Sequence, residues 1–357
     1  MGQGTRKAMP SMLTQKAREE HIPLSGVFEL TPRCTLDCKM CYVHLTPEQM
    51  GARRELTAEE WIKIIDEASR MGLLYAQVTG GECLLHPGFR EIFLKLKANG
   101  VLVAVNTNAT LLDQYMEFFK ENPPAKLLIS LYGSTEDGYE QVTGYRVHEK
   151  VERSILKAKR IGLNVHLNIS VSKYLYNETV DVVRFAVENK IPYTLDMNMQ
   201  EPNEDTHRRL EDFGLSTEEI VEKYIQIGYL LGVDRVQNAE KHGVPKLENE
   251  KLSVKGMRCS AGRSKFMIHW DGRFSPCFWL NGDDTNVLDI GFACAWERIK
   301  VEEENYLRPV ECESCEYLKV CSPCPYIRQD PKNVGHRNSK MCEVTIAKYV
   351  QGITKIK

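Results

Sequence analysis

Two kinds of hydrophobic pattern alternate through the first two hundred residues. Short apolar runs predict strands, and stretches whose apolar residues recur every three or four positions predict helices. Because helices are predicted between the strands, the pattern indicates an α/β fold with a parallel sheet. The six predicted strands cover 24–30, 73–78, 101–105, 126–131, 164–171 and 193–197.

The predicted helices carry boundary signals of their own. Thr57 and Glu60 form a capping box before a helix with Trp61 and Ile64 on its apolar face. Prolines and glycines bound several of the others, because proline interrupts a helix and glycine often ends one. These other helices are predicted over 87–99, 112–121, 148–161, 179–189 and 216–231.

Composition divides the chain into four expected parts. They are a mobile or loosely docked arm (1–23), a core (24–215), a bridging region (216–257) and a cysteine-rich domain (258–357). The last stretch of the core, 200–215, is dense in charged residues that include Arg208, so we expect a solvated linker there.

Length and charge narrow the class of protein. The chain has 357 residues, enough for two domains, and a net charge of −2, which points to neither nucleic acid nor an anionic membrane as a partner. It lacks a long apolar run and an apolar leader, so we expect a cytoplasmic protein. In that reducing compartment, most of its 12 cysteines are expected to bind metal rather than to form disulfides.

Cys34, Cys38 and Cys41 lie close together on a predicted loop after the first strand. Three thiolates could hold three irons of a [4Fe–4S] cluster and leave the fourth iron open to a ligand. The alternative is a structural zinc site with His44 as the fourth ligand, since C-x2-C is also a zinc spacing.

Further polar motifs follow the predicted strands, where the active sites of barrels lie. Gly80 and Gly81 would allow the backbone to approach a ligand closely, and Glu82 offers a carboxylate to an ammonium group. Each feature alone has an ordinary structural explanation: a turn with a surface acid, or a polar group satisfied at a strand end. The other polar residues at these positions are Asn106, Asn108 and Ser130.

Taken together, the cysteine loop and these motifs resemble the radical S-adenosylmethionine (SAM) enzymes over roughly residues 24–200. The resemblance implies a partial (β/α)6 TIM-like barrel. It also implies a [4Fe–4S] cluster whose open iron binds SAM, and reductive cleavage of SAM to a 5′-deoxyadenosyl radical. Two residues depart from the family pattern: Met40 replaces an aromatic residue and Cys83 replaces a proline. The SAM-binding residues that the resemblance implies are Met40, Tyr42, Gly80, Gly81, Glu82, Asn106, Asn108, Ser130, Arg146 and Leu195.

Arg146 and Leu195 have equally ordinary alternatives. Arg146 could pair with the SAM carboxylate, or it could be a surface arginine at the start of a helix. Leu195 lies where the family packs the adenine, although a core leucine is the usual explanation. Cys83 is expected to be a buried core thiol beside the SAM pocket.

The C-terminal cysteines resemble a SPASM domain, an iron–sulfur extension of some radical SAM enzymes, over about 259–345. Two zinc ribbons are the alternative. The resemblance implies two auxiliary [4Fe–4S] clusters, three clusters in all, although the Cys321–Cys324 spacing is one residue shorter than usual. Its ligands would be Cys312, Cys315, Cys321 and Cys342 for the distal cluster, and Cys259, Cys277 and Cys324 for the proximal one. Cys294 could be the fourth proximal ligand, or that iron could stay open.

SPASM enzymes mostly modify peptides or proteins. The first hypothesis is hydrogen-atom abstraction from a ribosomally made peptide, leading to a crosslink, a thioether or an epimer. The second is an anaerobic sulfatase-maturing enzyme, although Phe278 stands where such enzymes have an aspartate. A third, from another class, is a non-catalytic iron–sulfur or zinc scaffold. The expected partners are the substrate, an electron donor such as flavodoxin or ferredoxin, and a separate peptide-recognition protein if a leader peptide is bound.

Overall fold

The structure is a computed structural model. It describes residues 10–199, 202, 206–232, 259–280, 285–305, 309–317, 320–321, 329–330, 333–337 and 339–353.

An eight-stranded sheet organises the molecule, with strand order β6-β5-β4-β3-β2-β1-β7-β8. Neighbouring strands from β6 to β7 are parallel, and β8 is antiparallel to β7. All six strands predicted from the sequence are present, which confirms the α/β fold. The strands are β1 (Ser25–Glu29), β2 (Tyr75–Thr79), β3 (Leu102–Thr107), β4 (Lys126–Ser130), β5 (Val165–Ser170), β6 (Tyr193–Asp196), β7 (Lys265–Ile268) and β8 (Phe274–Ser275).

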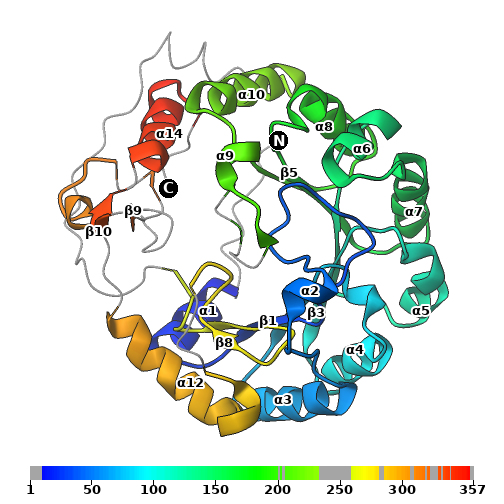
Figure 1. Cartoon of the computed structure of the whole chain (residues 1–357), viewed down its shortest axis with the longest axis vertical. Helices are drawn as coiled ribbons and strands as arrows, with labels where there is room; N and C mark the ends of the chain where they lie inside the picture. Colours follow the sequence, from blue (N-terminus) through cyan, green and yellow to red (C-terminus); the bar gives the residue numbers. More distant parts are fainter. Residues whose placement is uncertain are drawn as a thin grey trace.

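Helices surround this curved sheet (Figure 1). The predicted capping box is confirmed, since Thr57 and Glu60 exchange hydrogen bonds at the start of α3. Trp61 and Ile65 of α3 and Phe93 of α4 are fully buried in the core that these helices share with the sheet. These helices are α2 (Pro47–Met50), α3 (Ala58–Arg70), α4 (Phe89–Ala98), α5 (Met116–Glu121), α6 (Glu136–Thr143), α7 (His148–Arg160), α8 (Thr179–Glu188), α9 (Leu210–Phe213) and α10 (Thr217–Leu230).

The N-terminal segment, for which a mobile or loosely docked arm was expected, contains a helix. Residues Pro10–Glu19 form α1, in which Ala17 is buried, and the Trp296 indole nitrogen donates a hydrogen bond to the His21 carbonyl at 2.7 Å. Trp296 belongs to α12 (Val287–Asn305), so the start of the chain is attached to a helix from its C-terminal part.

The C-terminal part also completes the sheet. Strand β7 pairs with β1 in parallel, opposite the side that pairs with β2. Gly26 lies opposite Phe266, and a Cβ atom at Gly26 would stand 2.5 Å from the Phe266 ring, so only glycine admits this contact. The expected boundary between a core and a C-terminal domain is therefore crossed by one continuous sheet.

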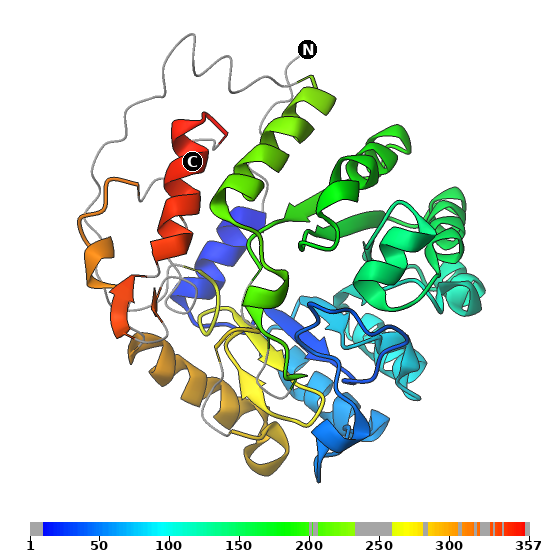
Figure 2. The same ribbon diagram turned by 45° about the horizontal axis from the view of Figure 1, so that its top comes forward.

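Beyond the sheet, α14 (Ser339–Val350) lies beside α10 (Figures 1 and 2). A two-stranded sheet of β9 (Gln329–Asp330) and β10 (Asn333–Arg337) precedes it. Across the described ranges, no helix is long and apolar enough to span a bilayer.

Candidate metal and cofactor centre

The loop with Cys34, Cys38 and Cys41 lies between the carboxyl end of β1 and α2. The parallel strands β2, β3 and β4 end at the same edge of the sheet, where active sites of barrel-like folds form. Cys38 is buried, and Cys34 and Cys41 are partly exposed.

The three thiols are close enough to affect one another electrostatically. Burial raises the pKa of Cys34 to about 12, and the neighbouring Cys41 adds to that increase. Burial also raises the pKa of Cys38, with contributions from Cys41 and Cys34, and raises the pKa of Cys41. Three adjacent thiolates in this environment are unfavourable without a bound cation, which is what a metal cluster would provide.

Hydrogen-bond donors point at two of the sulfurs. The Leu36 backbone nitrogen donates to Cys34 Sγ at 3.4 Å, and the His44 backbone nitrogen donates to Cys41 Sγ at 3.2 Å. The Asn108 amide nitrogen, from the end of β3, also donates to Cys34 Sγ at 3.4 Å. Such donors favour sulfur in its charged, metal-bound form.

These residues fit an iron–sulfur cluster better than a single ion. Within the described part of the chain, no three His, Cys, Asp or Glu side chains are arranged to hold one metal ion. His44, the alternative zinc ligand, has its Nδ1 atom 3.3 Å from Asp37 Oδ1. A [4Fe–4S] cluster binds each thiolate through a different iron, so its ligands need not converge on one point.

Gly80 and Gly81 pack against the cysteine loop. A Cβ atom at Gly80 would lie 2.6 Å from the Thr31 carbonyl oxygen, and one at Gly81 would lie 2.4 Å from the Arg33 carbonyl oxygen. The Gly81 nitrogen donates to the Thr31 carbonyl at 2.7 Å. The glycines therefore allow a close approach between two backbone segments, and this is a sufficient reason for both.

Glu82 is fully buried, and its carboxylate accepts hydrogen bonds from the chain itself. The donors are the Asn108 backbone nitrogen at 2.8 Å, the Thr107 hydroxyl at 2.8 Å and the Leu84 backbone nitrogen at 3.1 Å. Burial raises its pKa to about 7, against these donors, which lower it. Glu82 thus ties the turn after β2 to the turn after β3; its contact with a SAM ammonium stays a prediction.

Asn108 links the turn after β3 to the cysteine loop. Its amide nitrogen also donates to Thr35 Oγ1 at 3.0 Å, and its amide oxygen accepts from the Thr110 hydroxyl at 2.7 Å. Asn106 differs, because its side-chain oxygen is buried without a hydrogen-bond partner. A buried acceptor of this kind is the group that a bound ligand could satisfy.

The other predicted SAM contacts have varied surroundings. Arg146 is exposed and pairs with Asp137 and with Glu140, the latter at 3.0 Å. These contacts favour a surface arginine over a partner of the SAM carboxylate. Met40 is buried in the core, and Leu195 packs against the core while partly exposed. Ser130, at the end of β4, is a hydrogen-bond partner of Tyr132. Cys83 is fully buried, as expected.

Tyr42 belongs to the first cysteine loop and directly follows Cys41. Its pKa is raised by burial and by the negative charges of Cys41, Glu29 and Asp196. Glu29 ends β1 and Asp196 ends β6, and four strands lie between β1 and β6 in the sheet, so charged residues from distant strands act on the Tyr42 ring. Tyr42 as a residue remains 37% exposed.

The first cysteine loop meets the second cysteine region at Tyr42. The Tyr42 ring centroid is 5.5 Å from those of both Phe278 and Trp279, which follow Cys277 directly. Cys294 is exposed and lies on α12. Cys259, the first residue of the described segment 259–280, is exposed as well. Five other cysteines are partly exposed: Cys277, Cys312, Cys315, Cys321 and Cys342. Cys324 lies outside the described residues.

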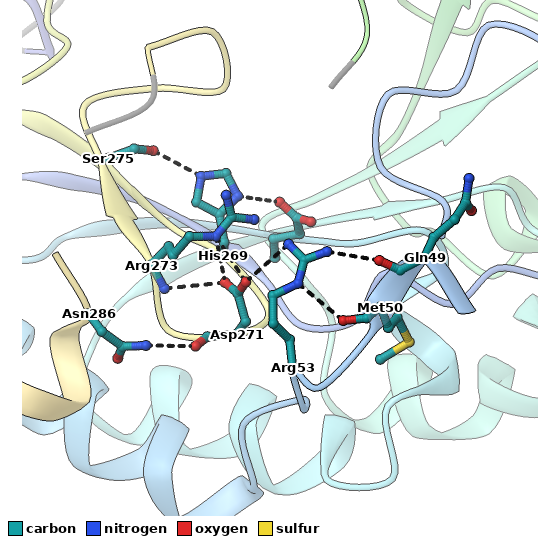
Figure 3. A network of polar contacts seen from close by, with 9 residues as sticks. Gln49, Met50, Arg53, His269, Asp271, Arg273, Ser275 and Asn286 are labelled. Atoms are coloured by element: carbon teal, nitrogen blue, oxygen red, sulfur yellow. Dashed lines mark hydrogen bonds and ion pairs between the residues drawn. The ribbon is translucent and has the colours of Figure 1, made fainter. Parts of the chain in front are cut away.

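A buried polar chain, unexpected from the sequence, joins the two parts of the molecule (Figure 3). His269 Nδ1 is 2.9 Å from Glu29 Oε2, and His269 Nε2 is 3.1 Å from Ser275 Oγ. Next to it, Asp271 pairs with Arg273 and, at 3.8 Å, with Arg53. No sequence motif marks these residues, and the pairing of β1 with β7 places Glu29 near His269.

Arg208 is a second residue that the sequence did not single out. Its Nη2 atom is 2.5 Å from Asp37 Oδ1, and its Nη1 atom donates to the His44 carbonyl at 3.4 Å. The expected solvated linker is therefore wrong at this point: the Arg208 side chain is only 18% exposed, and Phe213 and Leu215 behind it are buried. The density of charged residues led to the prediction of a solvated linker, although Arg208 in this segment contacts the cysteine loop.

Comparison with known proteins assigns the first part of the chain. Residues 28–186 match the Radical SAM superfamily. A probable GTP 3′,8-cyclase from Pyrococcus horikoshii is 28% identical over 267 residues, 72% of this chain and 84% of that protein. The antilisterial bacteriocin subtilosin biosynthesis protein AlbA from Bacillus subtilis is 36% identical over 109 residues, 30% of this chain and 24% of that protein.

Among solved structures, the fold is similar to that of SuiB from Streptococcus suis bound to precursor peptide SuiA. The TM-score is 0.70 at 18% identity, and the match covers 93% of this chain and 80% of that one. The similarity to SuiB shows the fold, and the superfamily match, which includes the cysteine loop and the strand ends described above, supports the assignment of that part of the chain. The chain carries a radical SAM domain over residues 28–186 and is an enzyme.

Proposed function

We propose that this enzyme modifies a peptide or protein, using SAM at the first cysteine loop and two auxiliary iron–sulfur clusters in its C-terminal part. The contact of Tyr42 with Phe278 and Trp279 carries the proposal, because it joins the first cysteine loop to the segment of Cys277. A substrate bound beside the Tyr42 ring would lie between the two cysteine regions.

The roles of individual residues follow from their positions. Cys34, Cys38 and Cys41 would hold a [4Fe–4S] cluster, and Asn108 would orient Cys34 through its 3.4 Å hydrogen bond. The open iron, when loaded, would supply one electron to SAM and so start radical chemistry. The unpartnered Asn106 side-chain oxygen would accept a hydrogen bond from SAM.

In the C-terminal part, the proposed ligands remain those of the family pattern. Cys312, Cys315, Cys321 and Cys342 would bind one auxiliary cluster. Cys259, Cys277 and Cys324 would bind the other. Cys294 is exposed on α12, and its place as the fourth proximal ligand remains open.

Two of the known proteins support a peptide substrate. SuiB was crystallised with a precursor peptide, and AlbA, by its name, acts in the biosynthesis of a bacteriocin. For the alternative of sulfatase maturation, an acidic residue after Cys277 would be expected. The residue there, Phe278, instead contacts Tyr42 through its ring.

A second candidate is cyclisation of a purine nucleotide. It rests on the probable GTP 3′,8-cyclase of Pyrococcus horikoshii, which resembles this chain over 84% of its own length. The two candidates separate in one assay, formation of 5′-deoxyadenosine from SAM under reductant. Stimulation by GTP would favour the cyclase and contradict the peptide proposal. Stimulation by a short peptide encoded beside the gene would support it.

Iron and acid-labile sulfide per chain after anaerobic reconstitution test the cluster count. We expect about twelve irons in the wild type and about eight after Cys34, Cys38 and Cys41 are all replaced by alanine, because each cluster contains four. Low iron with bound zinc in the wild type would contradict the cluster assignment.

A further inference from the structure

We propose that Arg208 is a positioning residue of the SAM-cluster site, which holds the first cysteine loop in shape and sets the charge beside it. This inference rests on the proposed cluster at Cys34, Cys38 and Cys41. It concerns a residue outside the stretch, 28–186, that matches the superfamily.

The geometry of Arg208 is that of a clamp. One end of its guanidinium group pairs with Asp37 at 2.5 Å, and the other donates to the His44 carbonyl at 3.4 Å. Asp37 directly precedes Cys38, and His44 lies three residues after Cys41. The two contacts therefore span the part of the loop that carries Cys38 and Cys41, and a planar, forked cation is suited to such a pair of acceptors.

Hydrogen bonds hold the same loop from the opposite side. The Asp37 nitrogen donates to the Thr143 carbonyl and the Lys39 nitrogen donates to the Val142 carbonyl, both at 3.0 Å. These bonds fix the backbone of the loop to the end of α6, but none brings a charge to it. Arg208, which follows β6 in the sequence, supplies the positive charge.

Charge at this position matters for reduction. The Arg208 guanidinium group pairs with Asp37, the residue directly before Cys38, so its positive charge lies beside the cysteine loop. One-electron reduction adds a negative charge to a cluster, and the reduction potential depends on the charges nearby. Loss of Arg208 would also leave the Asp37 carboxylate next to Cys38 without its guanidinium partner. Both effects disfavour the reduced state.

The test uses the reconstituted full-length enzyme and three variants. Arg208→Gln removes the charge, Arg208→Lys keeps it but replaces the fork by a single ammonium group, and Arg209→Gln is the control. Arg209 is the neighbouring residue, but its side chain is 67% exposed and pairs with Glu211 and Asp212 away from the loop. The readouts are iron per chain and the midpoint potential of the cluster whose EPR signal changes when SAM is added.

We expect the midpoint potential of Arg208→Gln to become more negative than that of the wild type. Arg208→Lys should restore most of the potential yet lose iron faster to a chelator, because a single ammonium group cannot hold both acceptors. Arg209→Gln should match the wild type in both measurements.

Wild-type potential and iron retention in Arg208→Gln would overturn the proposal, as would an equal change in Arg209→Gln. If Arg208→Gln loses the SAM cluster altogether, circular dichroism and the remaining iron content of the variant show whether the protein is still folded. A folded protein with about eight irons supports the proposal. An unfolded one leaves the decision to Arg208→Lys, whose wild-type iron loss would overturn it. The cluster assignment itself fails separately, through the iron content of the wild type.

Discussion

Two carboxylates of the core show that burial decides how an acid titrates even when its hydrogen bonds are similar. Glu82 and Glu178 each accept hydrogen bonds from two backbone nitrogens and at least one hydroxyl group. Burial favours a higher pKa at both carboxyl groups, and the hydrogen bonds favour a lower one. At fully buried Glu82 the effect of burial is larger, and the pKa rises to about 7. At Glu178, which is only partly buried, the hydrogen bonds from Thr135 and Ser134 prevail, and the pKa is lowered.

Opposite pH dependences follow for these two residues in the metal-free protein. Because the folded-state pKa of Glu82 exceeds its ordinary value of 4.5, its contribution to the unfolding free energy falls as pH rises from about 4.5 to 7. A shift of this size corresponds to roughly 3 kcal/mol at about 1.4 kcal/mol per unit. Glu82→Gln should abolish that part of the slope, as measured by urea unfolding across pH.

Glu178→Gln is the matched control and should act in the opposite sense. Its depressed pKa stabilises the folded state above the unfolded value and loses that effect as pH falls, so the variant should lose stability mainly at neutral pH. Parallel pH profiles for the two variants would contradict this account of Glu82.

At the same scale, the sequence identified the residues of the cysteine loop but not all of their reasons. The two glycines were predicted for close approach to a ligand, and the structure shows that they approach the Thr31 and Arg33 carbonyls. Arg208 could not have been found, because an arginine within a charged run is usually solvated and its partner Asp37 is 171 residues away.

At the scale of elements, local patterns predicted the strands and helices of the core well. All six predicted strands are present, and along β4 and β5 buried residues alternate with partly exposed ones, as expected for a sheet that is packed more closely on one face. Helix α6 was missed, because it is short and contains Gly138, a poor helix former. The pairing of β7 with β1 was also missed, because the local sequence of a strand does not specify a partner strand so distant in the chain.

The junction of β1 and β7 depends on the absence of a side chain at Gly26. A Cβ atom there would stand 2.5 Å from the Phe266 ring, and Phe266 is enclosed by Phe28, Phe274 and Phe292. Gly26→Ala should therefore lower the unfolding free energy by about 1–3 kcal/mol, the usual cost of overpacking.

A double-mutant cycle checks this explanation. Phe266→Leu removes the Phe266 ring atoms that the new methyl group would strike and, of the three nearest atoms, leaves only Phe28 Cε2, at 2.7 Å, so Gly26→Ala should cost less in that background than in the wild type. Equal costs in the two backgrounds would mean that the contact with Phe266 is not the cause.

At the scale of the whole molecule, two polar contacts join the N-terminal part of the chain to its C-terminal part. The buried Glu29–His269 pair and the Trp296–His21 hydrogen bond connect residues more than 200 positions apart. His269→Ala should lower the unfolding free energy by roughly 3 kcal/mol, because it leaves the Glu29 carboxylate buried without its partner.

The control for this prediction is His166→Ala on β5. His166 also makes a side-chain hydrogen bond, to Thr194 at 2.8 Å, but it has no paired carboxylate and is partly exposed. Its cost should be well below that of His269→Ala in chemical denaturation. Adding Glu29→Gln to His269→Ala should recover part of the stability, and no recovery would contradict the buried-charge explanation.

The position of β7 has a consequence for how the protein is made. Glu29 and His269 are 240 residues apart, so the outer edge of β1 has no partner while the ribosome synthesises that stretch. At about 5–20 residues per second this takes roughly 10 to 50 seconds. For that time the nascent chain presents an unpaired strand edge beside the first cysteine loop, a state prone to aggregation. Ribosome-bound chaperones that cover strand edges would therefore matter more for this enzyme than for one whose first strand finds both neighbours early.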